Sequence, residues 1–259
     1  MTRPETTPLL SAHRVRYDGH TADELQAVLR SPRVVLFDEV GSTLDVAHEL
    51  GEQGTAAGTL VLANAQTAGR GRLGRSWRSE PGSGIWLTVV ERPASHDALG
   101  VLALRLALAL APALDPFASE RVQLKWPNDL FIGDRKLAGI LVEARWRGAR
   151  LDWVAIGVGV NVRPPAELEV GGLSPGSDRM TVLAAVVPAL RAAAATGGPL
   201  TEDELQQFRV RDRAIGKRCT APIPGEVAGV RRDGALLVAG ANGVEAVLAG
   251  SLVLETEGR

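Results

Sequence analysis

Apolar residues fall into two kinds of stretch along the chain: short runs bounded by glycine, proline or charged residues, and longer runs rich in alanine and leucine. The short runs predict buried strands and the longer ones predict helices, because a strand needs few residues and a helix needs several turns. Strands are expected at residues 34–37, 59–63, 84–90, 121–125, 130–132, 136–145 and 150–162. Helices are expected at residues 23–30, 41–50, 97–111, 178–194 and 201–208.

From Ile215 onward the pattern changes to short stretches in which apolar and polar residues alternate. Asp233-Gly234 and Asn242-Gly243 are dipeptides typical of two-residue hairpin turns. This segment predicts a small antiparallel barrel appended to a larger domain of mixed strands and helices. We therefore expect three parts: a short N-terminal extension at 1–31, a main domain at 32–212 and the barrel at 213–259.

Composition and charge narrow the possible partners. The 259 residues carry a formal net charge of −1, which argues against general attraction to nucleic acid or membranes. A single cysteine, Cys219, excludes an internal disulfide framework, and the histidines lack metal-ligand spacing. The apolar stretch 99–114 contains Arg105 and Pro112 and is expected to be too short for a membrane span. No signal peptide is evident, so a soluble cytoplasmic protein is expected.

The segment QTAGRGRLGRSW at residues 66–77 alternates glycine with arginine and holds no acidic residue. Glycine lets backbone N–H groups approach a ligand, and guanidinium groups match phosphate or carboxylate oxygens. A loop this cationic predicts a bound anion, such as the phosphate of a small molecule. Its alternating residues are Gly69, Arg70, Gly71, Arg72, Gly74 and Arg75.

The same segment also fits the G-x-G-x-x-G fingerprint of dinucleotide-binding proteins. That fingerprint requires a helix directly after its last glycine. Pro81, Gly82 and Gly84 break helices there, so an NAD-type oxidoreductase is the weaker alternative. A Walker loop is excluded because no Gly-Lys-Ser/Thr follows the glycines. A solvated basic loop without a ligand is the remaining alternative.

A second motif, KWPND at residues 125–129, presents Lys125, Asn128 and Asp129 at a turn between two apolar strands. The rigid Pro127 restrains the backbone, so that polar side chains there can face a cleft. An ordinary polar turn is the alternative reading, because Asn-Asp pairs are common in turns.

A third motif, KLAGILVE at residues 136–143, begins an apolar strand with Lys136. A lysine at the mouth of a buried strand can clamp a carboxylate and a phosphate together, whereas an edge lysine that discourages aggregation is the alternative. Gly139 in this strand, and Gly157 and Gly159 in a later strand that ends at Asn161, remove side chains where a ligand could approach. Together they predict a flat, mostly apolar slot for a small molecule.

These motifs together resemble biotin protein ligase. GRGRLGRSW, KWPNDL and KLAGILVE occur in the order and with the spacing of that family, from about residue 34 to the C-terminus. The resemblance implies an α+β fold with a mixed, mostly antiparallel sheet and flanking helices of the class II synthetase type, plus a small C-terminal SH3-like β-barrel. Further residues fall where the family places ligand contacts: Ser42, Thr43, Gln66, Gly157, Gly159 and Asn161.

The resemblance implies a two-step reaction with ATP and biotin as substrates and Mg²⁺ as the counter-ion of the triphosphate. Biotin and ATP give biotinyl-5′-AMP and pyrophosphate, and a lysine of a biotin carboxyl carrier domain then displaces AMP. Arg72 would hold the carboxyl–phosphate junction, Lys136 would bridge carboxylate and α-phosphate, and Arg75 would assist with the triphosphate. Asp129 would either polarise the incoming lysine or help to hold Mg²⁺. These roles make Arg72, Lys136 and Asp129 the candidate catalytic residues.

The remaining roles concern the acid and the adenine. Polar side chains would bind the head or tail of biotin, glycines would leave room for it, and Trp77 would either stack near the adenine or order the loop. No residue is assigned as a metal ligand. The expected substrate-binding residues are Ser42, Thr43, Leu44, Gln66, Gly69, Arg70, Gly71, Arg72, Arg75, Trp77, Lys125, Asn128, Lys136, Gly139, Gly157, Gly159 and Asn161.

The chain departs from the family pattern at two places. Leu44 stands where such proteins often have Asn, so it is a less convincing polar contact. The residues before Val34 show no helix-turn-helix pattern, so we expect a monofunctional enzyme without a DNA partner. We also expect the enzyme to be a monomer or a weak homodimer. A ligase for lipoate or another medium-chain acid and a non-enzymatic biotin- or nucleotide-binding regulator are the alternatives.

Overall fold

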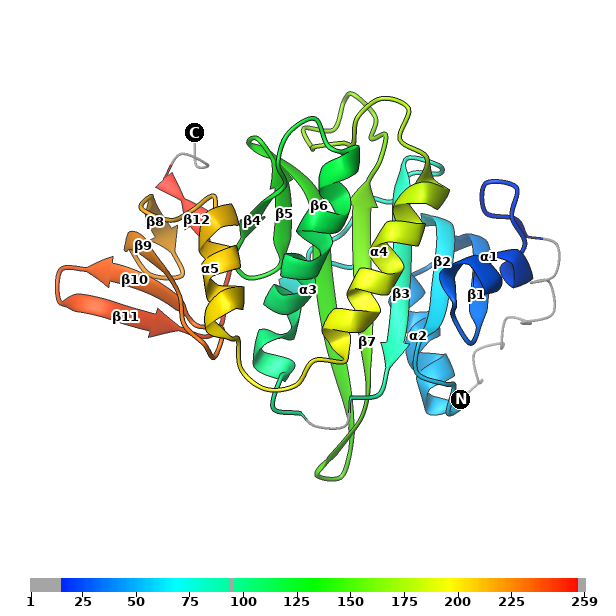
Figure 1. The fold of residues 1–259 in the computed structure, drawn as a ribbon, viewed down its shortest axis with the longest axis horizontal. Helices are drawn as coiled ribbons and strands as arrows, with labels where there is room; N and C mark the ends of the chain where they lie inside the picture. The colour runs from blue at the N-terminus through cyan, green and yellow to red at the C-terminus, as the bar shows by residue number, and fades with distance from the viewer. Residues whose placement is uncertain (1–14, 94–95, 256–259) are drawn as a thin grey trace, which may run out of the picture.

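The computed structural model describes residues 15–93 and 96–255 (Figure 1). A seven-stranded sheet forms its centre, in the order β1-β2-β3-β7-β6-β5-β4. β1 and β2 pair in parallel, and the other neighbouring strands of this sheet pair antiparallel. The strands are β1 (Val34–Val40), β2 (Thr59–Gln66), β3 (Gly84–Glu91), β4 (Gln123–Lys125), β5 (Asp129–Ile132), β6 (Arg135–Arg147) and β7 (Arg150–Asn161).

Helices cover both faces of this sheet. α3 and α4 lie side by side on one face, and α2 packs on the other face against β2, β3 and β7 (Figure 1). α1 flanks β1, and α5 contacts β4 and the adjoining α3. Capping boxes begin both α1 and α5 and satisfy backbone N–H groups there. The helices are α1 (Ala22–Leu29), α2 (Thr43–Glu52), α3 (Leu99–Leu114), α4 (Arg179–Ala194) and α5 (Glu202–Arg211).

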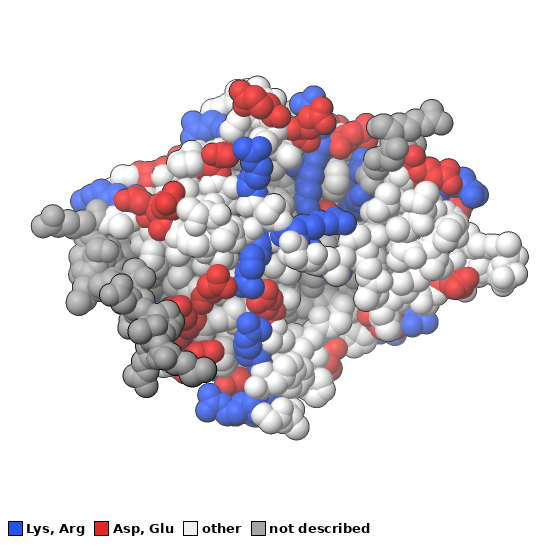
Figure 2. Space-filling model, turned by 180° about the vertical axis from the view of Figure 1, so that it is seen from behind, with Lys and Arg blue, Asp and Glu red and all other residues white. Residues whose placement is uncertain are grey.

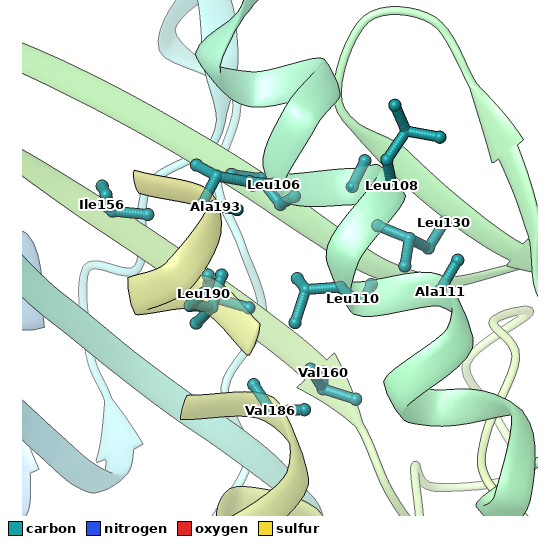
Figure 3. Close-up of a cluster of buried hydrophobic side chains, with 14 of the residues drawn as sticks. Leu106, Leu108, Leu110, Ala111, Leu130, Ile156, Val160, Val186, Leu190 and Ala193 are labelled. Carbon is teal, nitrogen blue, oxygen red and sulfur yellow. The ribbon is translucent and has the colours of Figure 1, made fainter. Parts of the chain in front are cut away.

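The main hydrophobic core lies between the sheet and the pair α3 and α4. Leu106 and Leu110 of α3 and Leu190 of α4 gather with Ile156 and Val160 of β7 (Figure 3). Each such buried side chain stabilises the fold by about 1.5–3 kcal/mol. A smaller core lies under α2 on the opposite face. The central strands are therefore buried on both sides and form a rigid support for whatever binds at their ends.

The residues after α5 form a second, five-stranded antiparallel sheet in the order β11-β10-β9-β8-β12. Trp126 donates its indole N–H to the carbonyl oxygen of Gly234 at 2.9 Å and so ties this sheet to the β4–β5 turn. Val227 and Leu236 belong to the main core. The strands are β8 (Arg218–Ala221), β9 (Gly225–Val230), β10 (Leu236–Gly240), β11 (Gly243–Val247) and β12 (Val253–Leu254).

The expected strands and helices are present in the described residues, with ends shifted by a few positions. The last three residues of the glycine fingerprint form a 3-10 turn, Arg72–Gly74, and the next element is β3, so the helix of a dinucleotide-binding fold is missing there. Both expected hairpins occur, but the β9–β10 connection is longer than a two-residue turn, and the β10–β11 turn consists of Ala241 and Asn242 because Gly243 already belongs to β11. The three domain boundaries remain predictions, and residues 1–14 and 256–259 lie outside the described residues.

The expectation that the apolar stretch is too short to span a membrane was wrong on length. α3 continues through a 3-10 turn, and Leu99–Phe117 forms a 19-residue helix that is long and apolar enough to cross a membrane. However, 56% of its most apolar 18-residue segment is buried inside the protein. Arg105 within it pairs with Glu204 at 2.6 Å. In this fold the helix packs as a core helix on the sheet and α4.

Asp212 gives this fold a testable dependence on pH. Burial raises the pKa of the Asp212 carboxyl to about 6, although the N–H of Ala214 donates to it at 2.9 Å. An unfolded Asp titrates near 4, so the folded state binds the proton more tightly. The stability that this proton contributes is complete below about pH 4 and is lost as the pH rises through 6.

The variant Asp212→Asn keeps an acceptor oxygen without a charge. We expect its stability relative to that of the wild type to increase as the pH rises. The difference in unfolding free energy between the variant and the wild type should increase by up to about 3 kcal/mol from pH 4 to pH 7.5, measured by urea denaturation. Equal differences at the two pH values would contradict burial of this carboxylate.

Candidate active site

A cavity of about 340 Å³ lies where the N-terminus of α2, the loop at 66–77, the β4–β5 turn and strands β6 and β7 meet. Residues 251–253, just before and within β12, line one side of it. On the face opposite α3 and α4, lysine and arginine side chains gather around a hollow (Figure 2). The lining includes most of the expected site residues: Ser42, Thr43, Leu44, Gln66, Arg70, Gly71, Arg72, Arg75, Trp77, Lys125, Asn128, Asp129, Lys136, Gly139, Gly157 and Gly159.

Glycines in the central strands make the flat wall of the cavity. Gly139 of β6 pairs with Gly159 of β7, and a Cβ on either would approach the Trp77 ring to 3.0 Å or 2.5 Å respectively. A Cβ on Gly157 would lie 3.1 Å from the Leu44 side chain. The space that these glycines leave is therefore occupied by Trp77 and Leu44, which form the apolar surfaces of the slot.

Two cations converge on the turn between β4 and β5. The guanidinium of Arg72 donates to Asn128 Oδ1 at 3.2 Å and to the carbonyl oxygen of Gly250 at 3.0 Å. The Lys136 ammonium pairs with Asp129 at 2.8 Å. Because the partners Asn128 and Asp129 are adjacent, both cations border the same end of the cavity. Partial burial lowers the pKa of the Arg72 guanidinium, because it disfavours the charged form.

Arg70 has a different environment from the one that the sequence suggested. No acidic residue is near it in the chain, but α2 and β6 bring Asp45 to 2.9 Å and Glu143 to 3.2 Å from its guanidinium. Glu143 also accepts from His48 Nε2 at 2.7 Å, and His48 Nδ1 accepts the indole N–H of Trp153 at 3.2 Å. Arg70 lines the cavity, yet two carboxylates already neutralise it and anchor the beginning of the loop.

The other end of the cavity is polar. Gln66 Oε1 accepts from the backbone N–H and the hydroxyl of Thr43 at 2.9 and 3.1 Å. Gln66 Nε2 donates to Ser79 Oγ at 2.8 Å, and Thr88 Oγ1 donates to the Thr43 hydroxyl at 2.8 Å. The buried hydroxyl of Ser42 has no hydrogen-bond partner among the described residues. An unpartnered buried hydroxyl is costly, so this position suits a ligand with polar atoms.

Two expected contact residues do not line the cavity. Gly69 faces the returning arm of its own loop, where a Cβ would lie 2.4 Å from the Trp77 carbonyl oxygen. Asn161 donates its side-chain amide to the Lys136 carbonyl oxygen at 3.2 Å, so it holds the strand that carries Lys136. Both residues were expected to touch the ligand directly, and both instead shape elements that do line the cavity.

Several lining residues were missed by the sequence analysis. Residues 251–253 reach the cavity from the second sheet, and no local motif marks them. Thr88 and Ser79 do not line it but bond to residues that do. The signal for Thr88 was available, because it is one hydroxyl in the otherwise apolar run Ile85–Val90 — written in the sequence as IWLTVV. Within the described residues, no three His, Cys, Asp or Glu side chains are grouped so that they could hold a metal ion.

Comparison with known proteins places this geometry in a family. Residues 37–161 match the model described as the Biotin/lipoate A/B protein ligase family. The biotin–[acetyl-CoA-carboxylase] ligase of Mycobacterium tuberculosis is 32% identical over 192 residues, which cover 68% of this chain and 70% of that protein. The bifunctional ligase/repressor BirA of Bacillus subtilis is 37% identical over 139 residues, or 53% of this chain.

The chain spans 43% of the length of that BirA protein, so the match concerns part of it. Among solved structures, biotin protein ligase from Aquifex aeolicus in complex with biotin and ATP superposes with a TM-score of 0.70 at 24% identity. The superposition covers 86% of this chain and 99% of that one. The shared fold, the family match and the extent of the mycobacterial alignment lead to one conclusion: the chain belongs to the biotin/lipoate A/B protein ligase family, with biotin protein ligases among its relatives.

Proposed function

We propose that this protein attaches biotin to a lysine of a biotin carboxyl carrier protein, with ATP as the source of energy and biotinyl-5′-AMP as the intermediate. The observation that carries the proposal is the convergence of Arg72 and Lys136 on the Asn128-Asp129 turn, at one end of a cavity whose other end holds the unpartnered hydroxyl of Ser42. A long, thin acid fits such a cavity with its carboxylate towards the cations. The names of the relatives support biotin as that acid.

In the first step a carboxylate oxygen of biotin attacks the α-phosphorus of ATP, and pyrophosphate leaves. Two anions must approach each other, so positive charge near the forming bond lowers the barrier. Arg72 and Lys136 supply that charge, and Arg75 and Lys125 extend it along the cavity wall. Arg70, which Asp45 and Glu143 already neutralise, is assigned to anchoring the loop.

In the second step the amine of the carrier lysine attacks the acyl carbon, and AMP leaves with the bonding electron pair. Asp129, held 2.8 Å from Lys136, can orient that amine or assist Mg²⁺, which would enter with the triphosphate. Trp77 lies under Lys136, with 5.1 Å between the ammonium and the ring centroid, and offers an aromatic face for the adenine. A cytoplasmic enzyme, monomeric or weakly dimeric and without a DNA partner, completes the proposal.

The identity of the acid is tested by ATP–pyrophosphate exchange with biotin, lipoate and octanoate in parallel. We expect biotin to support exchange at least about tenfold faster than the other two acids, because a pocket with fixed polar groups rejects a ligand that leaves them unpaired. A lipoate ligase is the second candidate, since the family model includes lipoate enzymes. Exchange with lipoate and none with biotin would reverse the assignment.

The variant Arg72→Ala tests whether Arg72 retains the bound adenylate. Loss of one charge-assisted hydrogen bond costs about 1.5–3 kcal/mol, so dissociation of biotinyl-5′-AMP should accelerate about 10- to 100-fold. The control is Arg78→Ala, which removes an exposed arginine that pairs with Glu80 and does not line the cavity. The measurement is release of radiolabelled adenylate on dilution. Unchanged release from Arg72→Ala would remove its assigned role.

The loop at 68–78 should be protected by its ligand. An acyl-adenylate hydrolyses when water reaches it, and a loop tied at Arg70 and Arg72 can cover it. We expect trypsin to cleave after the loop arginines in the free protein, and cleavage to slow severalfold with biotin and ATP together. Equal cleavage rates in the two states would contradict closure.

A further inference from the structure

Thr88 carries a hydroxyl group at a buried strand position, where an apolar side chain would be expected. It lies in the middle of β3, is fully buried, and pairs across the sheet with Val61 on one side and Gly157 on the other. Val fills the same volume and suits a buried strand at least as well. A buried hydroxyl is tolerated there only because it makes a hydrogen bond, and that bond goes to Thr43 Oγ1 at 2.8 Å.

The direction of this bond is fixed by the next one. Thr43 Oγ1 lies 3.1 Å from Gln66 Oε1, which can only accept, so the single hydroxyl proton of Thr43 must point to Gln66. The proton between the two threonines must therefore come from Thr88. Without that donor, the Thr43 hydroxyl would lose one of the two bonds that hold its rotamer.

The same reasoning fixes the other end of the chain of bonds. With Oε1 of Gln66 turned to Thr43, its Nε2 donates to Ser79 Oγ at 2.8 Å. The Ser79 hydroxyl in turn donates a hydrogen bond to the carbonyl oxygen of Trp77 at 3.4 Å. The bonds run in one direction from Thr88 through Thr43, Gln66 and Ser79 to the end of the arginine loop, and the hydroxyls of Thr43 and Ser79 each accept one bond and donate another.

We propose that Thr88 and Ser79 are positioning residues for acid recognition. They hold the Thr43 hydroxyl and the Gln66 amide in one orientation before the acid arrives, so binding does not have to order them. Neither Thr88 nor Ser79 lines the cavity, whereas Thr43 and Gln66 both do. The inference rests on the proposed function, in which this polar end of the cavity contacts biotin and the cationic end contacts the nucleotide.

Thr88→Val tests this inference, because the change removes the donor and keeps the shape. We expect the KM for biotin in pyrophosphate exchange and the Kd for biotin by calorimetry to rise about tenfold, with the KM for ATP within twofold of the wild type. Thr88→Ser, which restores the donor, should return both values towards the wild type. Ser79→Ala should raise the KM and Kd for biotin and leave the KM for ATP unchanged. This variant provides the test if Thr88→Val does not fold.

The matched control is Thr59→Val. Thr59 is also fully buried, in neighbouring strand β2, but its hydroxyl bonds to Ala56 and Thr55 rather than to a cavity residue. The Thr59→Val variant should be less stable than the wild type, with the KM and Kd for biotin unchanged. If Thr88→Val and Ser79→Ala behave like this control, or if the constants for biotin and ATP rise together, the positioning role is wrong. If the wild type binds no biotin at all, the proposed function itself fails.

Discussion

The candidate active site is organised around two cationic side chains that contact the same turn, between β4 and β5. Arg72 comes from a glycine-rich loop and Lys136 from the start of β6, and the adjacent Asn128 and Asp129 receive them. Burial and the nearby charge of Arg75 disfavour the charged form of Arg72, whereas the Asp129 carboxylate, which also pairs with Lys136, favours it. The arrangement favours a further anion in the cavity, and under the proposed function that anion is the substrate that carries phosphate and carboxylate together.

The rest of the molecule keeps these two groups together. The central strands are packed on both faces, so β6 and β7 hold their register and present paired glycines where Trp77 lies. The loop is fixed at two points, by Arg70 to α2 and β6 and by Arg72 to the second sheet. Through Gly250 and residues 251–253 that second sheet forms a wall of the cavity. This part of the chain therefore helps to shape the cavity.

The sequence predicted the elements well where the apolar pattern was regular, and the motifs located most of the cavity lining. It failed where a residue's partner comes from a distant segment. Arg70 has no acid beside it in the chain, but Asp45 and Glu143 arrive from α2 and β6. Asn161 ends a glycine-rich strand as expected, yet its amide turns to the backbone of Lys136. Such outcomes depend on strand register and loop path, which local spacing does not encode. The apolar helix Leu99–Phe117 was misjudged in length because its final 3-10 turn follows Pro112, which normally signals a helix end.

The central claim, that Arg72 and Lys136 grip one activated acid, is tested most directly by a crystal structure with a non-hydrolysable analogue of biotinyl-5′-AMP. The account predicts both cationic groups within hydrogen-bonding distance of the same phosphate, with the bicyclic head of the ligand at the Ser42 and Thr43 end. A phosphate bound by only one of the two cations, or a ligand seated with its head towards Lys136, would contradict it.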